Sequence, residues 1–291
     1  MKNLLQLAND GAADADFCTR LWTLLREAAS LTVKYAGLAL PDEVVVRLVT
    51  PEQFVEISAE NFELVSTEAI DAFEPGSPDH AAMVARVTTE RRRHRNQSTG
   101  GGLISKGAVV RRYFGGRELL ILPEVWIRNR FSDRFGTTIL GHELTHLAQS
   151  VLWEDMDSAF LRLNVPLARQ APRGKRLPLP TMVAVHHVRE GHATWVQKAI
   201  SLELSGVATA ERLPEEPKYS VRFRFFKALF VGVGHGPVYE QGAAFVEAVH
   251  AAGGQQLIRR LLSDEDLLPT YAEVGAPGEW LERCAPEAIS A

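Results

Sequence analysis

The chain of 291 residues is long enough for one large domain, and its 46% hydrophobic and 23% charged residues are ordinary for a globular protein. With 32 Lys and Arg against 36 Asp and Glu, the formal net charge is −4, which gives no reason to expect nucleic acid as a partner. No run is apolar enough for a signal peptide or a membrane span, and the two cysteines, Cys18 and Cys284, do not indicate a disulfide scaffold. We expect a cytoplasmic protein without membrane association.

The first part of the chain predicts a helix, a strand and a second helix. Residues 14–36 are amphipathic, with an apolar stripe at helical spacing, and Gly37 is placed to end this helix. A β-branched run at 42–50 predicts a strand. Pro51 then opens a short helix that we expect to end near residue 58.

A mostly polar stretch follows, with a loop at 75–78 after which Asp79 can cap another helix. This helix runs into the basic residues 91–95, and the glycine-rich residues 96–102 predict a loop. The basic run could contact nucleic acid or an acidic partner. Because cations are favoured near a helix C-terminus, we interpret it instead as a solvated helix end followed by a mobile loop.

Two β-rich runs, 108–114 and 117–122, flank the pair Gly115-Gly116 and predict a hairpin. The second strand could border a cleft and hold an extended ligand by strand addition. A plain buried strand is an equally good interpretation. Residues 123–134 predict a short helical or irregular connector.

The most informative stretch fits the pattern H-E-x-x-H from His142 to His146, in a helix that we expect Thr137 or Thr138 to cap. Positions i and i+4 share one helical face, so His142 and His146 can bind the same Zn²⁺ ion. Glu143 lies beside that face, where it can accept a proton from a water that the metal activates. A buried helix with two incidental histidines is the alternative.

A zinc site built on two histidines needs a third protein ligand and an open position. The pattern predicts one or two helical turns at 153–164, followed by a Pro-rich surface loop at 165–180 that could act as a lid. A strong helix is predicted next, at 181–204. Glu190 lies in this apolar helix, where a lone carboxylate is costly unless it is paired or bound to a cation. We therefore expect Glu190 to be the third ligand.

The neighbours of Glu190 leave alternatives open. His186 precedes it by four residues and His187 by three, so either could be a ligand or a partner of the site. Gly191 would let another backbone come close at this point.

Together these elements resemble the gluzincin metallopeptidases, and most closely the bacterial peptidase MA-like proteins. The H-E-x-x-H pattern, followed by E-G-x-A at 190–193 on a second helix, is similar to the ligand arrangement of that clan. The resemblance extends over well more than half of the chain. It implies a peptide or protein substrate, Glu143 as general base, and Zn²⁺ bound by His142, His146 and Glu190.

Two features depart from that clan. Forty-three residues separate His146 from Glu190, about twice the usual number, and the extra length falls in the Pro-rich loop. Several gluzincins also carry an acid four residues after the third ligand, which orients a metal-bound histidine. That position is Thr194 here, so the partners of the metal ligands must differ.

A third helix extends the resemblance, because Y-x-x-G-x-x-F beginning at Tyr239 is similar to a helix that follows the third ligand in that group. Pro237 is placed to begin this helix, and Gly253-Gly254 predicts a break before a closing helix. Hydrolysis needs a donor to the developing oxyanion, and Tyr239 and His235 are the candidates. A packing role for Tyr239 is an equal alternative.

The sequence therefore predicts an α+β, zincin-like fold, with a small mixed sheet over the helix of His142 and a mainly helical C-terminal half. Residues 1–136, with an edge-strand hairpin, and 137–291 would form one continuous catalytic unit. The predicted function is that of a zinc-dependent peptidase. The alternatives are a zincin-like binding or regulatory module with little activity and a metal hydrolase of a non-peptide amide. A structural protein without metal is more remote, and the sequence assigns no oligomeric state or cleavage specificity.

Overall fold

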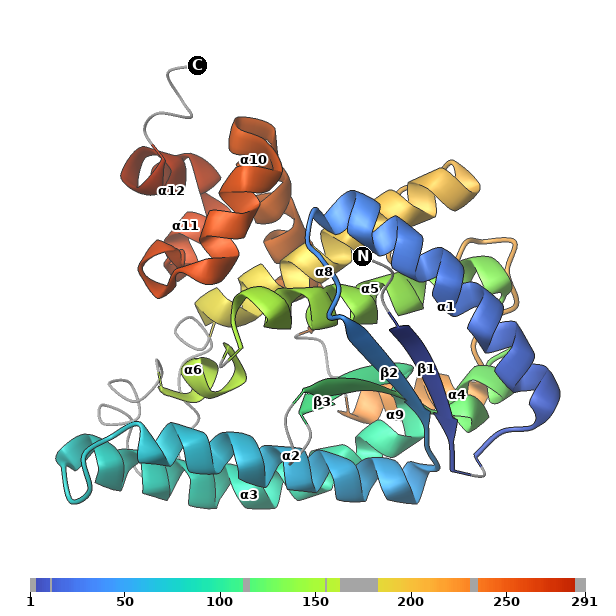
Figure 1. Ribbon diagram of the computed structural model, residues 1–291, viewed down its shortest axis with the longest axis horizontal. Helices are drawn as coiled ribbons and strands as arrows, with labels where there is room; N and C mark the ends of the chain where they lie inside the picture. Colours follow the sequence, from blue (N-terminus) through green and yellow to red (C-terminus); the bar gives the residue numbers. More distant parts are fainter. Residues whose placement is uncertain are drawn as a thin grey trace.

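The computed structural model describes residues 4–10, 12–111, 116–154, 156–162, 183–230 and 235–285. Helices surround one small sheet, which confirms the α+β expectation (Figure 1). The Pro-rich stretch at 165–180 and the turn residue Gly115 lie outside the described residues. None of the described helices is long and apolar enough to cross a membrane.

The sheet is mixed and has four strands in the spatial order β1-β2-β4-β3. The strands are β1 (Leu4–Asn9), β2 (Glu43–Leu48), β3 (Gly107–Arg111) and β4 (Arg117–Ile121). β1, β2 and β4 run parallel, whereas β3 pairs antiparallel with β4, as the predicted hairpin requires. β1 was not predicted, because its pairing with β2 depends on the crossover through the first helix.

One of the two interpretations of the second strand is wrong. This strand, β4, lies inside the sheet between β2 and β3, so it has no free edge to which an extended ligand could add. Its residues Leu119–Ile121 are fully buried, which supports the alternative of a plain buried strand. The edge strand of the hairpin is β3.

Helix α1 (Ala15–Ala36) connects β1 with β2 and confirms the predicted amphipathic helix. The Asp14 side chain accepts a hydrogen bond from the backbone N–H of Phe17, which caps the first turn. Leu21, Leu25 and Ala28 are buried, and they join α1 to the core formed by the sheet and the central helices.

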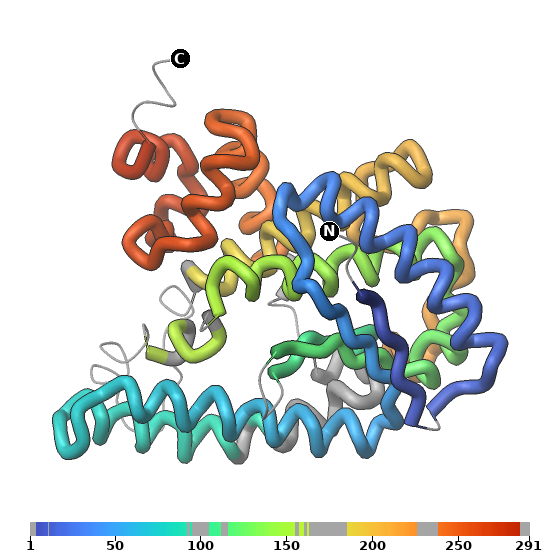
Figure 2. Tube along the Cα trace, viewed as in Figure 1, coloured from blue at the N-terminus to red at the C-terminus, as the bar shows by residue number. Residues whose placement is uncertain are grey.

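The helices α2 (Pro51–Asp71) and α3 (Pro78–Ile104) are much longer than predicted. They run side by side along one end of the molecule, opposite the C-terminal helices (Figure 2). Residues 61–71 and the expected loop at 96–102 are both helical. Ser77, rather than Asp79, caps α3, since its Oγ accepts a hydrogen bond from the N–H of His80.

Tertiary packing explains why this pair overrides the local signals. Apolar side chains from the two helices form a small core of their own, which lies apart from the main core. Its members are Phe62, Ala69, Ile70, Phe73, Ala82, Met83 and Val87. Burial of these side chains favours helix at positions where propensity alone predicts irregular structure.

After the short α4 (Pro123–Arg128), which confirms the expected connector, α5 (Asp133–Leu152) carries the H-E-x-x-H pattern. The expected caps are wrong, because α5 begins one turn earlier at Ser132, whose Oγ accepts from the N–H of Phe135. Thr137 and Thr138 lie inside the helix and are buried. Residue 137, the expected start of the helical part, therefore lies within α5 itself.

The remaining helices follow α5 in the chain, and the first of them, α6, confirms the turns expected at 153–164. They are α6 (Met156–Arg162), α8 (Val183–Ser205), α9 (Val221–Phe230), α10 (His235–Ser263), α11 (Tyr271–Gly275) and α12 (Pro277–Cys284), with a short 3-10 turn at Glu265–Leu267. The predicted break after residue 253 is confirmed: Gly254 has φ 62° and ψ −159°, a conformation that glycine adopts without strain. The helices α9, α11 and α12 were not predicted.

Candidate metal centre

Three helices meet at the candidate site. α5 carries His142, Glu143 and His146, α8 carries Glu190, and α10 carries Tyr239. α8 packs against both α5 and α10, and α5 also contacts β3 and β4. Residues far apart in the sequence are thus held by packed secondary structure, which gives the site a rigid frame.

The crossing of α8 and α10 depends on two glycines. A Cβ on Gly191 would lie 2.3 Å from the backbone carbon of Gly242, and a Cβ on Gly242 would lie 2.2 Å from the carbonyl oxygen of His187. No other residue fits at such distances. The expectation that Gly191 admits another backbone is confirmed, and the close crossing brings Tyr239 next to Glu190.

His142, His146 and Glu190 form a compact cluster of possible ligands, the one such group in the described part of the chain. The two Nε2 atoms lie 3.2 Å apart, and each lies 3.4 Å from Oε2 of Glu190. Ligands that sit about 2.1 Å from one zinc ion at tetrahedral angles are about 3.4 Å apart. The donor types and their separations therefore fit a tetrahedral cation with one position left open.

The cluster is largely shielded from water. The side chains of His142, His146 and Glu190 are 14%, 5% and 12% exposed. Burial alone would favour the neutral acid, but the charge of His146 and hydrogen bonds from both histidines hold the pKa of Glu190 well below its usual range. Burial opposes protonation of His146, yet the carboxylate of Glu190 outweighs it and raises the pKa of the imidazole. Glu190 is thus a carboxylate at neutral pH, the form that a metal ligand requires.

Glu143 and Tyr239 flank the cluster. Glu143 is half-buried, and its Cγ would lie 3.2 Å from a Cβ added to Gly107, so its side chain faces the start of β3. The ring of Tyr239 lies 6.3 Å from the ring of His142. The negative charge of Glu190, burial and the charge of Glu143 raise the pKa of Tyr239, so its hydroxyl stays a proton donor.

The other candidates have different positions. His186 is half-buried and its ring lies 6.3 Å from that of Tyr239, at the border of the cluster but not within it. His187 is buried, its ring lies 6.1 Å from that of Tyr271, and it is not a member of the cluster. His235 begins α10, but its side chain lies outside the described residues.

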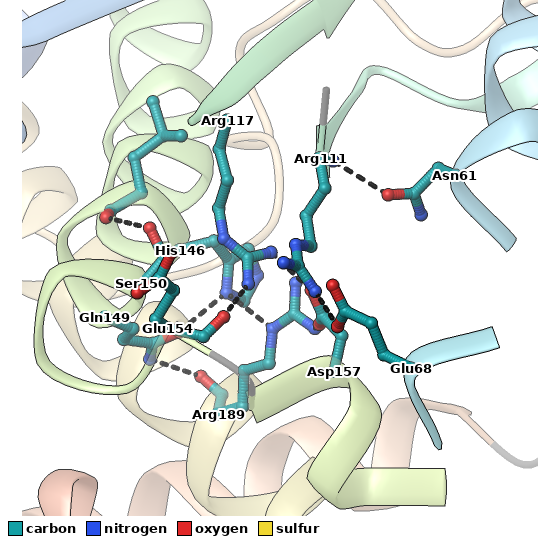
Figure 3. Close-up of polar contacts among 11 residues, drawn as sticks. Asn61, Glu68, Arg111, Arg117, His146, Gln149, Ser150, Glu154, Asp157 and Arg189 are labelled. Atoms are coloured by element: carbon teal, nitrogen blue, oxygen red, sulfur yellow. Dashed lines mark hydrogen bonds and ion pairs between the residues drawn. The ribbon is translucent and has the colours of Figure 1, made fainter. Parts of the chain in front are cut away.

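Around His146 lies a polar network that the sequence did not reveal. Its Nδ1 is 2.9 Å from Oε1 of Gln149 and 3.4 Å from Nε of Arg189. Arg189 in turn forms an ion pair of 2.5 Å with Asp157, and Asp157 also pairs with Arg117 from β4 (Figure 3). The spacing of Gln149 on α5, three residues after His146, is a signal that could have been found.

The charges of this network are strongly coupled. Burial alone would raise the pKa of Asp157, but the guanidinium groups of Arg189 and Arg117 lower it to about 2. Arg111 on β3 adds to this effect and forms an ion pair with Glu68 on α2. The ion pairs of Asp157 thereby tie α6 and strand β4 to the helix of Glu190.

A scan against protein-family models and a search of curated proteins each find no match to this chain. A solved structure from Chloroflexus aurantiacus, described as a "putative hydrolase with a novel fold", is similar in structure. It shares 18% identity with a TM-score of 0.50, over 94% of this chain and 91% of its own. This likeness shows a shared fold over nearly the whole chain, and the chemistry must be argued from the site.

Proposed function

We propose that the protein is a zinc-dependent peptidase of the gluzincin type, with His142, His146 and Glu190 as the metal ligands. The observation that carries the proposal is the convergence of these three donors from two helices, with separations that suit zinc. Glu143 beside them completes the H-E-x-x-H pattern on which such hydrolases depend. The description of the structurally similar protein as a putative hydrolase agrees with this proposal.

When bound, zinc with an open position supplies Lewis acidity, which makes water a stronger nucleophile and polarises a carbonyl group. Glu143 accepts the proton of the attacking water and returns it to the leaving amine nitrogen as the carbon–nitrogen bond breaks. The Tyr239 hydroxyl donates a hydrogen bond to the carbonyl oxygen as negative charge develops there. His186, at the border of the site, is not assigned a step.

The peptide would lie along β3. This strand forms the edge of the sheet, and its first residue, Gly107, lies beside Glu143. An extended peptide can pair with such an edge through main-chain hydrogen bonds. The N–H of Arg111 already donates to the Asn61 side chain on α2 at 2.7 Å, so pairing would be confined to the part of β3 next to Glu143.

The test is a cleavage profile of a mixed peptide library with zinc-loaded protein, against the variant Glu143→Gln. The amide cannot accept a proton, so hydrolysis should fall by at least a hundredfold while zinc stays bound. Normal cleavage by the variant would contradict the role of Glu143. Zinc-loaded wild-type protein that cleaves no peptide would contradict the peptidase and support a binding module or a hydrolase of non-peptide amides.

A further inference from the structure

We infer that Gln149 is the positioning residue that fixes His146 as a metal ligand, which rests on the proposed metal function. Its side-chain amide would hold the proton of His146 on Nδ1 and leave the lone pair of Nε2 directed at His142 and Glu190. Position 194 is a threonine and cannot act as the acid that orients a metal-bound histidine in several gluzincins. Gln149 would take that role here, with His146 as its partner.

The orientation of the Gln149 amide follows from its three partners. The nitrogen Nε2 lies 2.9 Å from the backbone oxygen of Arg189, which can only accept a hydrogen bond. The same nitrogen lies 3.2 Å from Nδ1 of His192, where its second hydrogen can be donated. The side-chain oxygen Oε1 is therefore the atom that faces His146, at 2.9 Å from Nδ1.

Because this oxygen can only accept, Nδ1 of His146 must be the donor in the 2.9 Å contact. The Nε–H of Arg189, 3.4 Å from the same nitrogen, is also a donor, so the tautomer that bonds to Gln149 leaves Arg189 to its shorter ion pair with Asp157. A neutral imidazole carries one N–H, so Nε2 of His146 then has a free lone pair, as a metal ligand requires. A flip of the Gln149 amide would break these hydrogen bonds. Because Gln149 is 1% exposed and His192 is 0% exposed, water could not replace the broken bonds.

The imidazoles of His142 and His146 differ in whether a hydrogen-bond partner fixes their tautomer. Nδ1 of His142 is buried and has no hydrogen-bond partner among the described residues, so nothing there fixes its tautomer. His146 thus carries the preorganised half of the site. Gln149 also donates to the backbone oxygen of Arg189, so the same amide links α5 to the segment of α8 that carries Glu190.

The chain offers a matched control. Gln197 is also buried, at 6% exposure, also lies on a helix of this core, and also donates its amide to a backbone oxygen, that of Ala210, at 3.2 Å. Among the described residues, Gln197 has no recorded hydrogen bond to His142, His146 or Glu190. Replacing either glutamine by methionine keeps the volume of the side chain and removes its hydrogen bonds.

The experiment measures zinc affinity of the full-length protein by competition with a chelating dye, for Gln149→Met, Gln197→Met and His146→Ala. We expect Gln149→Met to bind zinc about 10- to 100-fold more weakly, the effect typical of losing such a partner, and Gln197→Met to bind as wild type does. Wild-type affinity in Gln149→Met would overturn the inference. If His146→Ala also binds as wild type does, the proposed metal site itself falls.

A second measurement needs no variant and guards against a Gln149→Met protein that does not fold. Nitrogen-15 spectra of the histidine rings in zinc-loaded wild-type protein should show His146 bound through Nε2, with a slowly exchanging proton on Nδ1. Coordination through Nδ1, or a rapidly exchanging Nδ1 proton, would overturn the role of Gln149 even where peptide hydrolysis is normal.

Discussion

Among single residues, Asp157 is notable because it forms ion pairs with two arginines. Its carboxylate pairs with Arg117, whose side chain is 8% exposed, and with Arg189, whose side chain is 25% exposed. Replacing it with asparagine removes the one carboxylate among the described residues that compensates Arg117. Arg189 is then left with the charges of Glu190 and Glu143. We expect Asp157→Asn to lower the free energy of unfolding by about 3 kcal/mol in urea denaturation at pH 7.

The control is Asp71→Asn at the exposed end of α2, which should change the free energy of unfolding by less than about 0.5 kcal/mol. The effect of Asp157 also has a defined pH dependence. Its pKa is lowered from 3.8 to about 2 on folding, so its contribution is complete above pH 4 and disappears as the pH falls through 2. A difference between wild type and Asp157→Asn that is as large at pH 2 as at pH 7 would contradict this account.

Single residues of the site differ in how far the sequence could predict their positions. The closeness of His142 and His146 follows from helical periodicity, which is local, and the apolar context of Glu190 pointed to a buried cation. The partners of Gln149 could not be predicted, because the Arg189 carbonyl and His192 reach it only through the packing of α8 on α5. Contacts of this kind depend on tertiary structure.

Among the contacts between elements, the crossing of α8 and α10 leaves no room for a side chain at Gly191 or Gly242. A Cβ at position 242 would lie 2.2 Å from the oxygen of His187, which neither helix backbone can absorb without moving. We expect Gly242→Ala to destabilise the protein by about 1–3 kcal/mol and to reduce peptide hydrolysis, because the helices separate and Tyr239 moves away from Glu190. Thermal unfolding and a peptidase assay would measure both effects.

Gly278→Ala is the matched control for this crossing. Position 278 lies in α12, where an added Cβ meets nothing within 4 Å, so alanine should leave stability unchanged or raise it slightly. Equal stability of the two alanine variants would show that the α8–α10 contact tolerates a wider spacing than the structure has.

Element boundaries were predicted well where the signals are local. The ends of α1 and the break at Gly254 follow from caps and glycine, whereas the lengths of α2 and α3 follow from their mutual packing. The position of β4 inside the sheet could not be predicted from the sequence, because a hairpin pattern does not tell which of its two strands will pair with β2.

For the whole molecule, the fold places three helices and a sheet edge around one cluster of donors. The edge of β3 lies at Glu143, the ion pairs of Asp157 connect the sheet with α8, and the α8–α10 crossing carries Tyr239. The class of fold was predictable from the pattern of elements, but the way these parts enclose the site was not. These parts meet at His142, His146 and Glu190, the candidate metal centre from which the function is proposed.

The most direct test is the zinc content of protein that has been stripped with a chelator, reloaded and dialysed, measured by mass spectrometry of the metal. We predict one zinc ion per chain for the wild type and for Glu143→Gln, and almost none for His146→Ala and Glu190→Ala. A wild-type protein that retains no zinc, or a Glu190→Ala variant that retains as much as wild type, would contradict the account.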